Sequence, residues 1–315
     1  MNNIKPAGSD PRVCALLITE RIQKDKAFSN IVLGQELERA KLSTQDRSFL
    51  TALVYGVIER RRTIEYILSK YIKTAPVLRA SEILALGVCQ IMFMDKIPES
   101  AAVNESVKLA KKFLSEREAW FINAILRGVC HDREAIAAEI PTLPDGIRYS
   151  LSDSVCALIR EQYLDCHEKI FESFFKIKEL SLCVNTNRIS LAGLKEIFKR
   201  AGVDFVLDKS GGFIIKTHAQ KVLRMLPEGL FFVQGASSRR AVELLDISEN
   251  QLLIDTCACP GGKTLNAAVK MRNRGRIIAL DLHENKLPLI EKSAELLGIK
   301  IITTAGNDAR KSLPE

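Results

Sequence analysis

Residues 252–263, with the sequence LLIDTCACPGGK, constrain the fold of this chain more than any other stretch. An apolar run ends at Asp255 and passes through a short turn to Gly261 and Gly262, the pattern of a strand followed by a helix. Glycines let backbone N–H groups approach a ligand closely, and the N-terminus of the next helix carries partial positive charge. The stretch therefore predicts a binding turn for a nucleotide-like ligand.

Two kinds of glycine-rich turn compete for this stretch. A phosphate-binding P-loop requires a glycine where this chain has Cys257, so that interpretation fails. A doubly wound sheet instead expects an acid about 20 residues beyond the turn, at the end of the next strand, to bind a ribose hydroxyl. Asp281 fills that place, and a third apolar run at 299–303 leads to Asn307 and Asp308, where a side chain can reach an adenine edge. Three strand ends thus offer polar groups at one rim of a parallel sheet.

The segment 255–264, DTCACPGGKT, resembles the S-adenosylmethionine (SAM) signature of the Sun-type ribosomal RNA cytosine-5 methyltransferases. The usual wording in that family is Cys-Ala-Ala-Pro-Gly-Gly-Lys, from which only Cys259 departs. The resemblance implies a Rossmann-like α/β fold with SAM as cofactor. It assigns the following residues to SAM binding: Cys257, Ala258, Cys259, Pro260, Gly261, Gly262, Lys263, Asp281, Lys286 and Asp308.

Methylation at C5 of cytosine requires a thiolate that adds to C6. In the family that this chain resembles, the catalytic cysteines lie in a Thr-Cys motif and an Asp-x-Pro-Cys motif. This sequence has no cysteine after Cys259 and therefore neither motif at the expected place. We expect Cys257 and Cys259 to face the cofactor and not the target base, so we expect no catalytic residue in this chain. By resemblance, the chain is then a C-terminally incomplete member of the family that is inactive on its own. The usual order pairs the first strand with a fourth, which predicts an open apolar edge at residues 252–255.

Residues 11 to about 139 predict helix after helix. The clearest lies at 44–61, where Ser43 and Asp46 form a capping pattern ahead of an apolar stripe. We expect the core to include Leu50, Leu53, Val54, Val57, Ile58, Val103, Val107, Ala110, Leu114, Phe121, Ile125 and Val129, and also the only tryptophan, Trp120. The run 83–94 is too short to span a bilayer and predicts a buried helix.

This region resembles the NusB-type RNA-binding domain. The matching segments are Asp46 with residues 50–57, residues 81–84, Ile97-Pro98 with 103–111, and residues 121–126. The candidate RNA contacts are the basic residues near helix ends, Arg60, Arg61, Arg62, Lys108, Lys111 and Lys112. Such groups neutralise phosphates, but arginines also stabilise helix C-termini and lysines often only cover a solvated face, and both interpretations stay open.

The net charge of +8 favours an anionic partner, which the resemblance specifies as small-subunit ribosomal RNA; an acidic membrane surface is the weaker alternative. Eight cysteines without a disulfide framework and an N-terminus without a signal pattern lead us to expect a cytoplasmic protein. The four histidines form no ligand cluster, so we expect no metal site. The oligomeric state stays open.

Between these regions, Pro141, Pro144 and Gly146 predict a linker at 139–149, followed by helices at 154–164 and 167–178. Strands at 182–185, 205–207, 213–216 and 230–233 and a helix at 191–201 predict a small α+β module. It resembles the RNA-recognition-like module of the Sun-type enzymes. Cys183 replaces their arginine, and Gly235 and Ala236 replace their acidic pair.

These expectations combine into a multidomain protein: a NusB-like all-α domain at 1–139, a helical linker with the small α+β module at 150–234, and the first half of a SAM-binding α/β domain at 235–315. By resemblance, the function is SAM-dependent methylation at C5 of a cytosine in 16S ribosomal RNA. The alternative is a non-catalytic RNA-binding protein that uses only the NusB-like domain.

Overall fold

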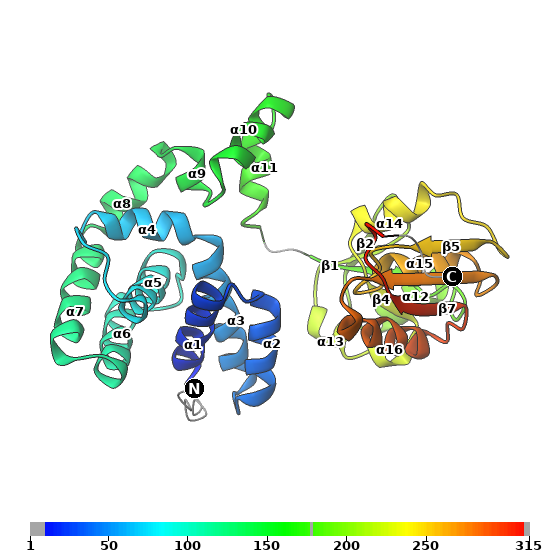
Figure 1. Ribbon diagram of the computed structural model, residues 1–315, viewed down its shortest axis with the longest axis horizontal. Coiled ribbons are helices and arrows are strands. Elements are labelled where there is room, and N and C mark those ends of the chain that lie inside the picture. The colour runs from blue at the N-terminus through cyan, green and yellow to red at the C-terminus, as the bar shows by residue number, and fades with distance from the viewer. Residues whose placement is uncertain (1–9, 177–178, 312–315) are drawn as a thin grey trace. The chain divides into compact units, whose positions relative to one another are not determined.

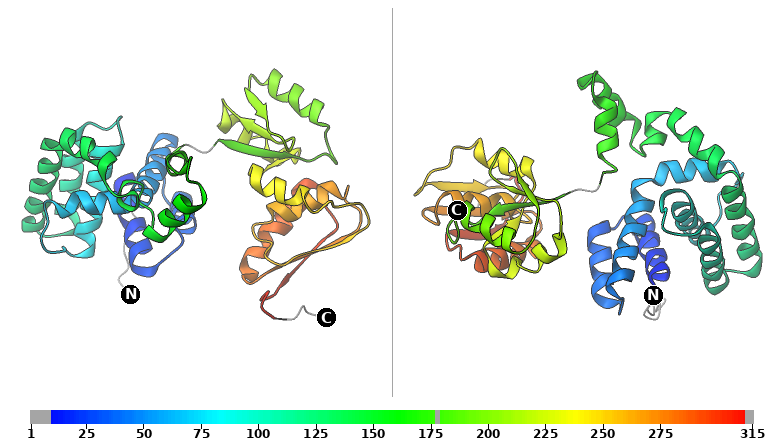
Figure 2. Two further views of the ribbon diagram at one scale, coloured as in Figure 1. Left: turned by 90° about the horizontal axis from the view of Figure 1, so that it is seen from above. Right: turned by 180° about the vertical axis from the view of Figure 1, so that it is seen from behind.

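The computed structural model describes residues 10–176 and 179–311. The chain divides into two compact units, Met1–Lys176 and Ile177–Glu315, which are taken separately here. The first unit is helical and the second carries the strands, as Figure 1 and the further views in Figure 2 show. In the described part of the chain, no helix combines the length and the apolar character needed to cross a bilayer.

The first unit confirms the all-α prediction. Its elements are α1 (Pro11–Asp25), α2 (Ser29–Arg39), α3 (Thr44–Glu59), α4 (Arg61–Ser69), α5 (Leu78–Phe93), α6 (Glu99–Phe113), α7 (Glu116–His131), α8 (Arg133–Glu139), the 3-10 turn η1 (Ile140–Thr142), α9 (Asp145–Arg148), α10 (Asp153–Gln162) and α11 (His167–Ser173). Helix α5 is buried nearly all round and contacts α1, α3, α4, α6 and α7, which confirms the buried helix expected at 83–94.

Helix α3 illustrates how local sequence forms this core. Ser43 Oγ accepts the N–H of Asp46 at 3.1 Å and so caps the helix start. The stripe Leu50, Leu53, Val54 and Val57 is fully buried, as predicted. Burial of each such side chain contributes roughly 1.5–3 kcal/mol.

The linker expected at 139–149 is wrong, because η1 and α9 fill that stretch; η1 packs on α8, and α9 packs on α4. Thr63 Oγ1 donates to Ile147 O at 2.6 Å, and the Arg62 N–H donates to Ser150 Oγ at 2.8 Å. The prolines therefore shape turns without releasing the chain.

Helices α10 and α11 also belong to the first unit. Tyr149, Cys156 and Phe171 form a small buried cluster that joins them to α9. Helix α11 ends at Ser173, and the expected helix end at 177–178 lies outside the described residues. The expected segment 150–234 spans the division between the units; the domain boundaries stay a prediction.

The second unit holds two sheets. Its elements are β1 (Leu180–Val184), α12 (Leu191–Arg200), β2 (Phe205–Leu207), β3 (Phe213–Ile215), α13 (Ala219–Leu223), the 3-10 turn η2 (Leu226–Glu228), β4 (Phe231–Val233), α14 (Ala236–Glu243), β5 (Leu252–Asp255), α15 (Gly262–Lys270), β6 (Arg276–Asp281), the 3-10 turn η3 (Glu284–Lys286), α16 (Leu287–Leu297) and β7 (Ile302–Gly306). Strands β2-β3-β1-β4 form an antiparallel sheet, and β5-β6-β7 form a parallel sheet. The predicted α+β module and α/β region are both confirmed.

One core joins the two sheets. Cys183 of β1 and Phe232 of β4 are buried in the same cluster as Leu265 and Val269 of α15. A buried thiol therefore stands where the resembling enzymes have an arginine. In the described residues β5 is an edge strand, with 62% of Leu252 exposed, so the open apolar edge expected there is confirmed.

Candidate functional site

The turn after β5 is fastened by the acid that ends the strand. Asp255 Oδ1 accepts the N–H of Cys257 at 3.3 Å, and Asp255 Oδ2 accepts the hydroxyl of Thr264 at 2.7 Å. Gly261 has a φ of +103°, and a Cβ there would lie 3.0 Å from Ile290 Cγ1. Only glycine fits this position without strain, which explains the first of the two glycines.

The end of β6 lies directly against this turn. Asp281 Oδ2 accepts the N–H of Cys259 at 2.9 Å, and Asp281 Oδ1 accepts the N–H of His283 at 3.0 Å. The His283 N–H is the main cause that lowers the pKa of Asp281, with the Cys259 N–H adding to it against a partial burial that raises it. Asp281 is therefore an ionised acceptor beside the turn.

The third strand end joins the same rim. The N–H of Asn307 donates to the backbone oxygen of Asp281 at 3.0 Å. The side-chain Nδ2 of Asn307 is buried and has no hydrogen-bond partner among the described residues. Asp308 pairs with Arg310 at 2.6 Å, and that contact lowers the pKa of Asp308. A buried donor without a partner next to an ionised acid fits a polar heterocyclic ligand.

Most backbone donors of the turn are used within the chain. The N–H groups of Cys257, Ala258, Cys259 and Gly261 bind Asp255, Leu280, Asp281 and Ala258 in that order, and Pro260 has none. The first N–H groups of a helix have no partner within it. The N–H groups of Gly262 and Lys263, which begin α15, are therefore the backbone donors of the turn that remain available to a ligand.

Lys286, the remaining basic residue expected here, ends η3. Burial raises the pKa of the Cys259 thiol, Asp281 raises it further, and the charge of Lys286 opposes both. Lys286 thus lies close enough to the turn to act on it. The predicted cofactor residues at three strand ends are brought together at one rim.

Each of the three consecutive arginines has a partner within the first unit, although 36% of the Arg62 side chain is exposed. Arg60 packs over the ring of Phe93 at 4.4 Å and over that of Phe175 at 4.1 Å, and burial lowers its pKa. Arg61 forms an ion pair with Glu82 at 2.8 Å. Arg62 pairs with Asp153 at 2.9 Å and also donates to Leu151 O. Each guanidinium of this triplet thus has a partner inside the first unit, and its contact with RNA stays a prediction.

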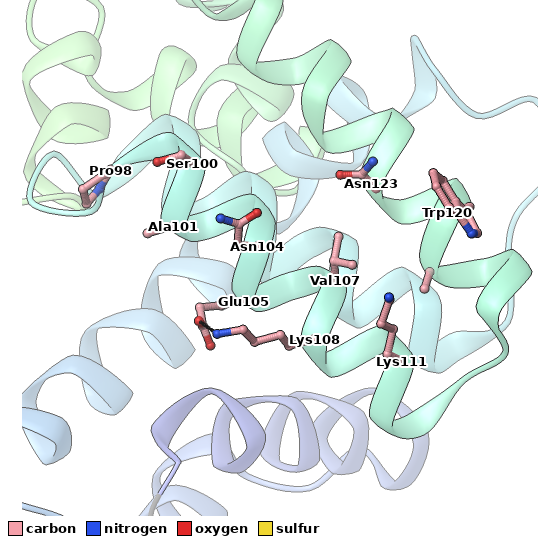
Figure 3. Close-up of a pocket in the computed structure, with 11 residues that line it drawn as sticks. Pro98, Ser100, Ala101, Asn104, Glu105, Val107, Lys108, Lys111, Trp120 and Asn123 are labelled. Atoms are coloured by element: carbon pink, nitrogen blue, oxygen red, sulfur yellow. Dashed lines mark hydrogen bonds and ion pairs between the residues drawn. The ribbon is translucent and has the colours of Figure 1, made fainter.

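The expected core position of Trp120 is also wrong, since 70% of this residue is exposed. Helix α7 buries its other face, through Ala119, Ile122 and Leu126, and so turns Trp120 outward. Figure 3 shows Trp120 beside a groove between α6 and α7. The groove has a volume of about 610 Å³ and is lined by Pro98, Ser100, Ala101, Asn104, Glu105, Val107, Lys108, Lys111, Ala119, Trp120 and Asn123.

Of the three lysines expected to contact RNA, Lys108 and Lys111 line the groove. Lys108 is exposed and pairs with Glu105 at 2.6 Å, as drawn in Figure 3. Lys111 is exposed, and Lys112 lies over the ring of Phe113 at 5.3 Å. The groove thus combines an exposed indole, cations and amide side chains on one face.

Two known protein families match this chain, one in each unit. The NusB family matches residues 9–131, and the family described as 16S rRNA methyltransferase RsmB/F matches residues 242–313. The chain is 28% identical to the "Probable ribosomal RNA small subunit methyltransferase B" of Bacillus subtilis (strain 168), an alignment that covers 96% of this chain and 69% of the relative.

It is 30% identical to the protein of the same name from Synechocystis sp. (strain ATCC 27184 / PCC 6803 / Kazusa), covering 92% of this chain and 68% of the relative. The solved structure titled "Crystal Structure of PH0851" has the same fold, with a TM-score of 0.72 at 20% identity over 98% of this chain and 72% of that chain. This chain, with its NusB-like helical unit and its parallel-sheet rim, belongs to the ribosomal RNA small subunit methyltransferase B family.

Proposed function

We propose that this protein is a SAM-dependent methyltransferase that acts on C5 of a cytosine in 16S ribosomal RNA. The observation that carries the proposal is the rim of β5-β6-β7, where the turn, Asp281 and Asn307 are linked by hydrogen bonds of 2.9 and 3.0 Å. Ligands of such sheets bind beyond the carboxyl ends of their strands. The names of the relatives support RNA of the small ribosomal subunit as the substrate.

Each part of the rim suits one part of SAM. The free N–H groups of Gly262 and Lys263 suit the carboxylate of the methionine portion. Asp281 suits the ribose hydroxyls, and the Asn307 amide with Asp308 suits the adenine. Bound SAM supplies an electrophilic methyl group, while these residues orient the cofactor.

Calorimetric titration of SAM into the full chain and into Asp281→Asn tests this assignment. Asp281→Asn keeps the shape of the side chain but lacks a full negative charge, so SAM affinity is expected to fall about tenfold or more, equivalent to at least ~1.4 kcal/mol. Glu243→Gln, which alters a half-buried carboxylate paired with Arg240 on α14, is the matched control and is expected to leave affinity unchanged. Equal affinity of all three chains contradicts the assignment.

We propose the groove between α6 and α7 as the RNA contact of the first unit. The exposed Trp120 offers a stacking surface for an unpaired base, and Lys108 and Lys111 lie beside it to neutralise phosphates. Asn104 and Asn123 add hydrogen-bonding groups suited to base edges. Titration of a fluorescent single-stranded RNA at two salt concentrations tests this; a salt-independent affinity contradicts it.

A second candidate is RNA binding without methyl transfer by these 315 residues. Burial raises the pKa values of Cys14, Cys89 and Cys183 to about 12, and the Cys259 thiol also has a raised pKa. Such thiols are poor nucleophiles near neutral pH. Incorporation of labelled methyl from SAM into small-subunit RNA by the purified chain decides between the two, because any stoichiometric transfer eliminates the second candidate.

A further inference from the structure

Two buried amide side chains connect the antiparallel sheet of the second unit to its α/β part. Asn185 follows β1, and its Nδ2 donates to the backbone oxygens of Gly229 and Leu297, both at 2.9 Å. Gln234 follows β4, and its Nε2 donates to the backbone oxygen of Gly262 at 2.9 Å. The exposed fractions are 0% and 4%. Asn185 thus reaches the end of α16. Gln234 instead reaches the first residue of α15, in the turn at residues 255–264 that is proposed to bind SAM and is called the cofactor turn below.

The backbone of Gln234 is held on both sides. Its N–H donates to Ser181 O at 3.0 Å and continues the β1–β4 ladder, and its backbone oxygen accepts from Arg239 Nη1. Its side-chain Oε1 is buried without a partner among the described residues. A flipped amide would set Oε1 against the oxygen of Gly262, so the donor orientation is fixed.

Arg239 makes this arrangement rigid. It is 2% exposed, and its Nε donates to Ser210 Oγ at 3.1 Å while Nη1 donates to Ser181 Oγ at 3.0 Å. Its Nη2 pairs with Asp208 in the β2–β3 turn. One guanidinium therefore joins β1, the β2–β3 turn and the backbone of Gln234.

The hydrogen bond from Gln234 Nε2 to Gly262 O also fixes the direction of the next backbone N–H, that of Lys263. The oxygen of Gly262 and the N–H of Lys263 belong to one planar unit and point in opposite directions. A donor that holds the oxygen from the sheet side therefore aims the N–H of Lys263 away from the sheet. That N–H is one of the donors that α15 leaves without a helical partner.

We propose that Gln234 is a positioning residue for the cofactor turn and that Arg239 holds Gln234 in place. The small α+β module thereby sets the direction of the Lys263 N–H. This assignment rests on the proposed SAM site for its effect on affinity. Its structural part, the fixed Lys263 peptide, is independent of any ligand.

The test compares Gln234→Leu with Asn185→Leu in the full chain. Both remove a buried amide that donates to a backbone oxygen, so both are expected to lower the thermal stability of the second unit. Gln234→Leu alone is expected to loosen the start of α15, where the Leu265 N–H donates to Gly261 O at 2.8 Å. It should therefore speed hydrogen exchange at the Leu265 amide about tenfold and weaken SAM binding about tenfold. Asn185→Leu is expected to change neither in the folded protein.

Two results overturn the assignment: equal Leu265 exchange in both variants, or SAM binding by Gln234→Leu that equals binding by the wild-type chain. If the wild-type chain binds no SAM, the proposed cofactor site fails, while Leu265 exchange still decides the positioning role. If Gln234→Leu does not fold, Arg239→Lys replaces it. This variant keeps a cation for Asp208 but cannot reproduce the forked contacts. It is expected to raise Leu265 exchange severalfold, and unchanged exchange contradicts the proposal.

Discussion

Arg61 and Glu82 form a two-point ion pair between α4 and α5, with Nη1–Oε1 at 3.0 Å and Nη2–Oε2 at 2.8 Å. Only 2% of the Glu82 side chain is exposed, against 17% for Arg61. The pair is therefore a structural element of the first unit, in a place where three arginines in a row suggest a nucleic-acid contact.

Arg61→Met is expected to destabilise the first unit by about 3 kcal/mol, because it leaves the Glu82 carboxylate buried without its partner. Urea denaturation measures the loss. The control Arg62→Met breaks a pair in which 80% of the Asp153 side chain is exposed, and we expect a loss of about 1 kcal/mol or less. Similar losses in the two variants would show that the Arg61 pair is not special.

Trp120→Ala is expected to weaken binding of single-stranded RNA about tenfold, since stacking of one base contributes about 1–3 kcal/mol. The melting temperature is expected to stay constant because the indole packs little against the unit. Trp120→Phe should retain most of the affinity. Phe174→Ala, which removes another exposed aromatic ring of this unit, is the control. A loss shared by both alanine variants would exclude a specific role for the groove.

Lys111→Ala is expected to reduce the slope of log affinity against log salt by about 0.7, the contribution of one phosphate contact to a single strand. Lys108→Ala is expected to reduce it less, because Glu105 already pairs with Lys108. The measurement is RNA titration at several salt concentrations. An unchanged slope for Lys111→Ala means that this lysine only covers a solvated face.

The contrast between α3 and the arginines shows what the sequence alone can predict. Helix α3 has its cap and its apolar stripe within its own residues, so local pattern suffices. The partner of Arg61 lies on another helix, and that of Arg62 lies beyond α9. Contacts between residues far apart in the chain leave no local pattern.

Trp120 and the cofactor turn show two further limits of prediction from the sequence. Trp120 lies off the stripe that α7 buries through Ala119, Ile122 and Leu126, so it faces solvent. The expected core also includes the neighbouring Phe121, and 38% of that residue is exposed, so the expected edge of the buried face is wrong at both positions. In the turn, the motif predicts which strand ends meet. It does not predict that neighbouring residues use most of the backbone donors, because this depends on three-dimensional geometry.

Gly261→Ala is expected to lower both the stability of the second unit, by about 1–2 kcal/mol, and its affinity for SAM. The residue has a left-handed φ of +103°, and a Cβ would press on Ile290 at 3.0 Å. Gly202→Ala is the matched control, because Gly202 has a φ of +68° but open space around it. It should lose stability without losing SAM affinity. Equal effects on affinity would indicate that general destabilisation explains both.

The pairing of Asp208 with Arg239 predicts how the second unit responds to acid. Burial by itself raises the pKa of Asp208, but donors from Ser210, Gly212 and Arg239 outweigh it and lower the pKa below the usual value. A carboxyl with a lowered pKa contributes stability above its unfolded pKa of about 3.9. That contribution is lost as the pH falls through the folded pKa.

Asp208→Asn is therefore expected to destabilise the second unit clearly at pH 7, where Arg239 keeps its charge but loses its carboxylate partner. The difference from wild type should shrink as the pH falls below the unfolded pKa of about 3.9, because the unfolded wild-type chain then takes up the proton before the folded one. Urea denaturation at pH 7 and at about pH 3 measures both quantities. Glu196→Gln, which alters an exposed pair with Arg200 at 3.3 Å, is the control and is expected to have little effect at either pH. A difference between Asp208→Asn and wild type that stays constant from pH 7 to about pH 3 would mean that protonation of Asp208 is not linked to folding.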